Sequence, residues 1–125
     1  GLPELSKMDE PDYFHKGEFY ASINEVKDYI KKYRKLYFYK GYFPATAKPV
    51  KNKKFSFVNL DVDIYQSTLN SLKFFYPRMN QGGVIISHDY PSSPGAKKAI
   101  DEFFADKKEI AIELFGSGQC LIVKV

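Results

Sequence analysis

Apolar side chains recur along this chain with periods that change between those of helices and those of strands. Helical spacing of three and four residues predicts helices over 23–33, 66–76 and 94–104. Ser22 and Glu25 form a capping-box pattern before the first helix, Pro77 stops the second, and Ser93 caps the third.

Short apolar runs predict five strands, at residues 35–41, 54–63, 83–89, 109–115 and 119–125. The last two are separated by "GSGQ" and are typical of a hairpin. The alternation of strands and helices predicts an α/β fold in one domain, with a mostly parallel sheet, a C-terminal antiparallel hairpin and helices on both faces. Residues 1–21 should be irregular, because Pro3, Pro11 and Gly17 interrupt any long element.

The charge and composition of the chain indicate which kinds of molecule it is expected to bind. The net charge is +4, and the basic residues gather in "KDYIKKYRK" and "KPVKNKK". We interpret these clusters as solvated surface and expect neither nucleic-acid nor membrane binding. We expect a soluble, cytoplasmic protein whose single cysteine, Cys120, packs inside a buried strand.

Four polar residues stand where two predicted strands end. Asp61 and Asp63 close the strand 54–63, on one face if side chains alternate, and His88 and Asp89 close the strand 83–89. A right-handed crossover between parallel neighbours would bring these ends together, at the sheet edge where α/β folds bind ligands. Clustered carboxylates repel one another unless a cation or a shared proton intervenes, and a divalent metal is the simplest remedy. Alternatively, Asp61 and Asp89 cap the helices or turns that follow.

The stretch from "FVNLDVDIYQST" through "YPRMNQGGVIISHDYPSSPGAKKAIDEFF" resembles the C-terminal half of the macrocin O-methyltransferase family, and "GLPE", "HKGEF" and "KGYFP" extend the resemblance towards residue 1. These are S-adenosylmethionine-dependent enzymes that methylate sugar hydroxyls of natural products. The resemblance implies that Asp61 and Asp89 ligate a divalent metal and that Asp63 takes the proton from the acceptor hydroxyl. His88 stands where the family usually has an acid, which implies a weakened magnesium site, a softer metal or no metal requirement.

One family feature is missing from this sequence. No glycine-rich turn for S-adenosylmethionine precedes residue 35, so the cofactor-binding residues remain unassigned. The resemblance then implies a partial Rossmann-like methyltransferase fold without its first two strands. In the family's strand order 3-2-1-4-5-7-6, residues 35–41 would be strand three and 54–63 strand four, whose edge would be exposed. Three outcomes would cover this exposed edge or account for it. Strand three moves over to pair with it, a second copy of the chain covers it, or the sequence is a fragment of a longer protein.

We therefore expect an S-adenosylmethionine-dependent O-methyltransferase, in fragment or truncated form, that acts on a small-molecule hydroxyl with metal assistance. Residues 1–21 would form a flap over the acceptor, and the isolated chain should be inactive or weakly active. The alternatives are a non-catalytic binding or assembly module, and a metal-dependent hydrolase that uses the Asp-x-Asp and His-Asp pairs with a bound water.

Overall fold

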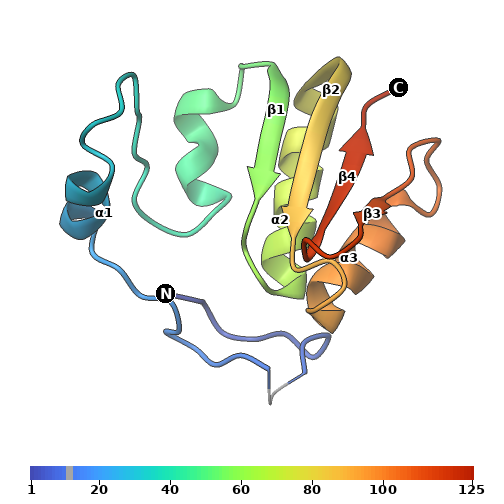
Figure 1. Cartoon of the computed structure of the whole chain (residues 1–125), viewed down its shortest axis with the longest axis horizontal. Helices are drawn as coiled ribbons and strands as arrows, with labels where there is room; N and C mark the ends of the chain where they lie inside the picture. The colour runs from blue at the N-terminus through green and yellow to red at the C-terminus, as the bar shows by residue number, and fades with distance from the viewer. Residues whose placement is uncertain (11–12) are drawn as a thin grey trace.

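The computed structural model describes residues 1–10 and 13–125. Along the chain, the elements are α1 (Ile23–Tyr29), the 3₁₀ helix η1 (Ala45–Val50), β1 (Phe55–Leu60), α2 (Tyr65–Phe75), the 3₁₀ turn η2 (Tyr76–Arg78), β2 (Met79–His88), α3 (Pro94–Phe104), β3 (Ile112–Leu114) and β4 (Gln119–Val123) (Figure 1).

The described strands form one sheet in the order β1-β2-β4-β3. β1 and β2 are parallel, with Leu60 opposite Ser87, whereas β4 runs antiparallel to both β2 and β3. The parallel pair and the closing hairpin confirm the predicted fold class. The observed order is also the 4-5-7-6 half of the sheet that the resemblance implied.

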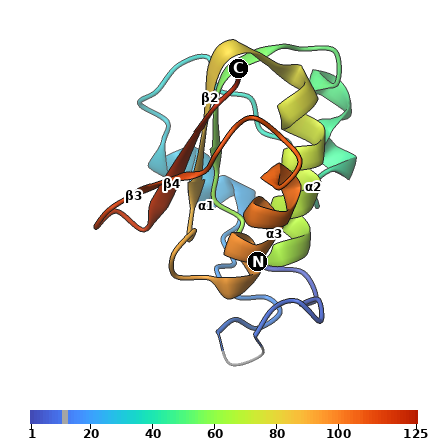
Figure 2. The same cartoon turned by 90° about the vertical axis from the view of Figure 1, so that its right-hand side faces the viewer.

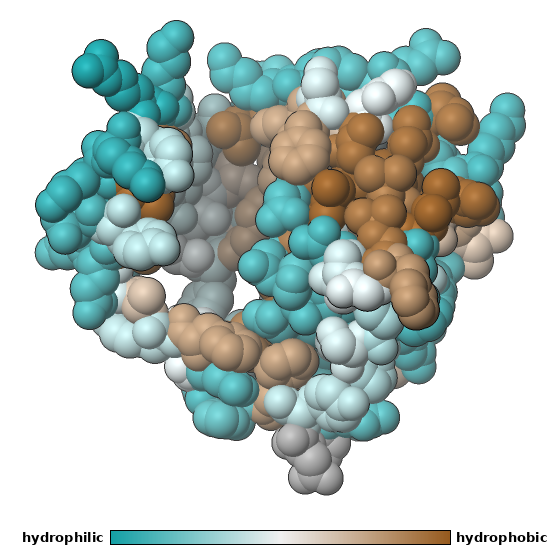
Figure 3. All heavy atoms as spheres, viewed as in Figure 1, coloured by the Kyte–Doolittle hydropathy of each residue, from teal (hydrophilic) through white to brown (hydrophobic). Residues whose placement is uncertain are grey.

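Both long helices cover the same face of the sheet, where α2 and α3 pack side by side (Figure 2). Alternate strand residues such as Val58, Ile85 and Ile122 point into the core beneath them. The prediction of helices on both faces therefore holds for one face only. No described helix covers the opposite face of the sheet, where the side chains of Phe57 and Val123 are exposed. Apolar side chains gather on this face over β2 and β4 (Figure 3).

Local capping signals place the helix starts as predicted. Ser22 and Glu25 make the reciprocal hydrogen bonds of a capping box, but α1 ends at Tyr29 rather than at 33. The Ser93 hydroxyl accepts a hydrogen bond from the Ala96 amide at 3.3 Å, with Pro94 at the first position of α3.

The predicted strand at residues 35–41 is wrong. This segment has no ladder partner, Lys35 has a φ of 60°, and Tyr37 is 80% exposed. A strand is stable only beside another strand, and this segment lies apart from β1 (Figure 1). Strand three therefore does not move over to cover β1, whose outer edge is unpaired within the described part of the chain.

The N-terminal segment, residues 1–10 and 13–21, contains no helix or strand in its described part, as predicted, although Pro11 lies outside the described residues. It passes below the carboxyl ends of β1 and β2 (Figure 1). Among the described helices, none is both long and apolar enough to span a membrane.

Candidate active site

Asp61 and Asp63 lie in the loop that follows β1. Because β1 ends at Leu60, the premise that strand alternation places both acids on one face is wrong. Asp63 instead has a φ of 60°, a left-handed conformation that aspartate tolerates better than most residues. The Ser93 hydroxyl donates a hydrogen bond to the Asp63 carbonyl at 2.7 Å. A cap residue of α3 therefore holds the loop that carries Asp63.

His88 and Asp89 lie beside these acids because β1 and β2 end at the same level of the parallel pair. His88 Nδ1 is 3.1 Å from Asp89 Oδ2 and 3.7 Å from Asp61 Oδ1. Asp89 also has a φ of 60°. The structure thus brings together all four residues that the sequence singled out.

The cluster perturbs the pKa values of two of its members. Burial, a hydrogen bond shared with Asp89, and the nearby negative charges of Asp89 and Asp61 raise the pKa of Asp63 to about 6. The hydrogen bond to Asp89 and the three surrounding carboxylates raise the pKa of His88, because they favour the imidazolium. The pKa of Asp63 therefore lies well above that of an ordinary aspartate.

The donor set fits a divalent ion. One oxygen each from Asp61 and Asp89 and one nitrogen from His88 lie within 4.8 Å of one another. Ligands on a shared ion at about 2.1 Å lie at most about 4.2 Å apart, so small side-chain movements would close this set. An imidazole among the ligands favours Mn²⁺, Fe²⁺ or Zn²⁺ over Mg²⁺.

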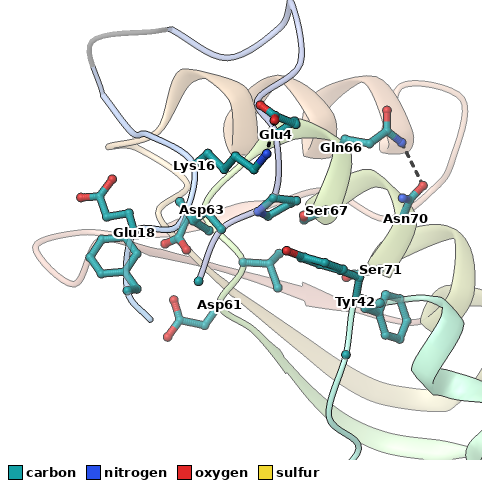
Figure 4. A pocket seen from close by; sticks show the side chains of 17 residues that line it. Glu4, Lys16, Glu18, Tyr42, Asp61, Asp63, Gln66, Ser67, Asn70 and Ser71 are labelled. Carbon is teal, nitrogen blue, oxygen red and sulfur yellow. Dashed lines mark hydrogen bonds and ion pairs between the residues drawn. The ribbon is translucent and has the colours of Figure 1, made fainter. Parts of the chain in front are cut away.

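Two hollows meet at Asp61 and Asp63. The larger, of about 750 Å³, extends from these acids to Lys16 on one side and to Gln66 and Asn70 of α2 on the other (Figure 4). The smaller, of about 470 Å³, is lined by the four cluster residues together with Phe14 and Phe19 of the N-terminal segment. Both volumes lie in the range of small-molecule sites.

The alternative interpretation, that the acids cap helices, fails for α2 and α3. The first amide of α2, at Tyr65, donates to the Asp9 carboxylate at 2.7 Å, and Ser93 caps α3. Asp89 does stabilise a turn, because its carbonyl accepts from the Ser93 amide at 2.8 Å and its carboxylate accepts from the Ser92 hydroxyl at 3.2 Å.

Sequence reasoning missed Asp9 and the polar wall formed by α2, whereas Phe14 and Phe19 belong to the segment 1–21 that is predicted to form a flap over the acceptor. Gln66 and Asn70 are one helical turn apart, and their amide groups are hydrogen bonded at 2.9 Å. That spacing is readable from the sequence. Asp9 left only an indirect signal, which is the absence of any capping side chain at Ile64, the residue before α2.

The chain matches known O-methyltransferases in sequence. It is 33% identical over 98 residues to the demethyldecarbamoylnovobiocin O-methyltransferase of Streptomyces niveus, an alignment that covers 75% of this chain and 37% of that protein. It is 29% identical over 80 residues to an 8-demethyl-8-(2,3-dimethoxy-alpha-L-rhamnosyl)-tetracenomycin-C 4'-O-methyltransferase of Streptomyces olivaceus, covering 61% and 31% of the two chains.

Solved structures show the same fold. The O-methyltransferase NovP superposes with a TM-score of 0.73 at 27% identity, covering 83% of this chain and 45% of that chain. The apo structure of CalS11, a TDP-rhamnose 3'-O-methyltransferase, gives a TM-score of 0.53 at 16% identity over 65% of this chain and 37% of that chain, a likeness of fold alone.

The chain thus spans between about a third and a half of the length of these relatives. The model of the macrocin O-methyltransferase (TylF) family matches residues 1–116, which is nearly the whole chain. The chain therefore belongs to the macrocin O-methyltransferase family.

Proposed function

We propose that this chain carries the acceptor site and part of the donor site of an S-adenosylmethionine-dependent O-methyltransferase that methylates a hydroxyl of a sugar or other natural product. The observation that carries the proposal is the convergence of Asp61, Asp63, His88 and Asp89 at the carboxyl ends of β1 and β2, between two hollows. A transferase brings two substrates to one point, and two cavities that share Asp63 suit that requirement.

In the proposed reaction, Asp63 is the general base. Its carboxylate takes the proton of the acceptor hydroxyl while the oxygen forms a bond to the methyl carbon of the sulfonium donor. The carbon–sulfur bond breaks with its electron pair remaining on sulfur, so S-adenosylhomocysteine leaves as a neutral thioether. A pKa of about 6 suits this role, because Asp63 is then ionised at neutral pH yet more basic than an ordinary aspartate.

Asp61, His88 and Asp89 would hold a divalent metal. When bound, such an ion would lower the pKa of the acceptor hydroxyl and orient it. The side chains themselves provide an acidic wall beside Asp63, and the aromatic rings of Phe14 and Phe19 line the same hollow from the N-terminal segment.

We assign the acceptor to the smaller hollow and the methyl donor to the larger one. The smaller hollow contains the proposed metal ligands, which an acceptor hydroxyl must approach. The larger hollow is lined by side-chain amide and hydroxyl groups of α2, which can form hydrogen bonds with the polar groups of the methyl donor. This division places Asp63 at the junction, where the transferred methyl group must pass.

We further propose that a second copy of the chain covers the outer edge of β1. This edge pairs with no described strand. Unpaired apolar edges favour association with another strand.

The experiment that tests the function is transfer of a labelled methyl group from S-adenosylmethionine to sugar hydroxyls. The chain is joined to the amino-terminal half of a family member, so that a complete methyltransferase domain is assayed. Asp63→Asn should lower the turnover rate by roughly 10²- to 10⁴-fold, the usual contribution of a positioned base. Asp28→Asn, which removes an exposed acid in α1, is the matched control and should turn over at the parent rate. Equal rates for the two variants would exclude Asp63 as the base.

A further inference from the structure

Backbone hydrogen bonds join the two ends of the N-terminal segment into a closed loop. The Leu2 amide donates to the Glu18 carbonyl at 2.9 Å, and the Gly17 amide donates to the Leu2 carbonyl at 2.9 Å. Leu2 is buried. These contacts fix the two ends of a loop to each other, and Phe14 near the end of that loop and Phe19 directly after it line the smaller hollow. Something else must fix the loop to the body of the protein.

Asp9 makes that connection with both of its carboxylate oxygens. Oδ1 accepts from the Tyr65 amide at 2.7 Å, which supplies the cap that Ile64 cannot give to α2. Oδ2 accepts from the Ser6 amide at 2.9 Å and from the Ser6 hydroxyl at 2.6 Å. One oxygen therefore binds the helix and the other binds the loop. The negative charge also lies at the positive end of the α2 dipole, which has no acid of its own in its first turn.

Gly95 provides the space for this carboxylate. It is buried in the first turn of α3, and a Cβ atom built on it would lie 2.1 Å from Asp9 Oδ1. No other residue type would leave the carboxylate where it lies. Glycine is otherwise a poor helix residue, so its presence here is explained by the approach of Asp9.

We propose that Asp9 is a positioning residue that, with Gly95, locks the N-terminal segment across the starts of α2 and α3 and so places Phe14 and Phe19 against the acidic cluster. Asp9 acts through these two aromatic side chains and not by contact with substrate. The role in acceptor binding rests on the proposed function, whereas the lock itself does not.

The lock is tested by hydrogen exchange on the 125-residue chain. Asp9→Ala removes both acceptors, so the Leu2 and Gly17 amides should exchange roughly fivefold or more faster, as expected for the loss of a helix cap that also anchors a loop. Asp9→Asn keeps one oxygen for the Tyr65 amide and should show a smaller increase. Amides of β2 should exchange at the parent rate in both variants. Parent exchange rates at Leu2 and Gly17 in Asp9→Ala would overturn the proposal.

Gly95→Ala tests the same contact from the other side in a double-mutant cycle. In the parent, the added methyl group expels the Asp9 carboxylate and should lower the thermal midpoint. In the Asp9→Ala background that clash is gone, and the next contact of the methyl group is the Tyr65 nitrogen at 3.1 Å, which a small shift relieves. The fall in midpoint should therefore be smaller in that background. Equal falls in the two backgrounds would show that Gly95 and Asp9 are independent, which contradicts the lock.

The functional consequence is measured separately, in the methyl-transfer assay with the completed domain. Asp9→Ala should raise the KM for the acceptor, Asp9→Asn should restore part of the loss, and the affinity for Mn²⁺ alone should not change, because no metal-ligating side chain is altered. An unchanged acceptor KM in Asp9→Ala would overturn the positioning role. If the parent domain transfers no methyl group while the exchange and midpoint results hold, the lock stands and the proposed function fails.

Discussion

Asp63 should make the protein less stable at neutral pH than its asparagine variant. Its pKa rises from an ordinary value of 3.8 to about 6 on folding, chiefly through burial. Below about pH 3 the carboxyl is mostly protonated in both the folded and the unfolded state, so it contributes little difference. As the pH rises to 6, the unfolded chain loses this proton more readily, and the free energy of unfolding falls. The full difference corresponds to about 3 kcal/mol, and partial exposure to water reduces it to about 1–3 kcal/mol.

Asparagine has nearly the same shape and cannot ionise. We therefore expect Asp63→Asn to unfold at a higher urea concentration than the parent at pH 8, and at nearly the same concentration at about pH 3. Urea denaturation at both pH values, with a chelator present to remove bound metal, measures this difference. Asp28→Asn is again the control, because its carboxylate is exposed. A variant that is less stable than the parent at pH 8, or a difference that does not change with pH, would refute the burial of a costly carboxylate at this position.

Four further predictions concern the fold, the metal, the cofactor and the assembly. Burial opposes ionisation of Glu109, but hydrogen bonds from Lys124, the backbone and Tyr76 outweigh it and lower its pKa to about 2, so Glu109→Gln should destabilise the chain above about pH 5 and have little effect near pH 2, as measured by urea denaturation. Asp61→Asn should weaken Mn²⁺ binding with partial rescue by excess metal, whereas His88→Asp should tighten Mg²⁺, and calorimetry that finds neither change would exclude the metal site. The isolated chain should bind S-adenosylmethionine no better than roughly millimolar, about −4 kcal/mol, and micromolar binding would show that these residues alone build a cofactor pocket. Light scattering should find a dimer or larger assembly, and a monomer at high concentration would mean that the edge of β1 stays uncovered.

The parts of the fold that sequence predicts well are those fixed by local contacts. Ser93 and Pro94 specify the start of α3 within one turn, and the hairpin of β3 and β4 follows from apolar runs around a glycine-rich turn. Residues 35–41 have the composition of a strand but no partner strand beside them. Whether a segment becomes a strand depends on pairing with a distant part of the chain, which a local sequence pattern does not reveal. The same limit hid Asp9, which caps a helix that begins 56 residues later in the chain.

The candidate site was predictable for a different reason than the one the pattern suggested. Alternation along a strand does not apply, because both acids lie beyond Leu60. The parallel register of β1 and β2 brings these acids next to His88 and Asp89. The sequence indicates this register indirectly, because a helix between two apolar strands is typical of a parallel crossover.

The backbone at Asp63 and Asp89 makes a purely structural role for these acids difficult to sustain. Both residues have a φ of 60°, where glycine is unstrained and asparagine is at least as well accommodated as aspartate. Either replacement would keep the turn without placing a negative charge beside two other carboxylates. The Asp63 side chain is also half-buried, which raises its pKa. The Asp63 carboxylate thus adds electrostatic cost to a position that is already strained, and it caps neither α2 nor α3 in return. Proteins keep electrostatic and backbone costs of this kind where the side chain has a function. We therefore favour a site that binds a cation and transfers a proton, rather than a turn that only joins a strand to a helix.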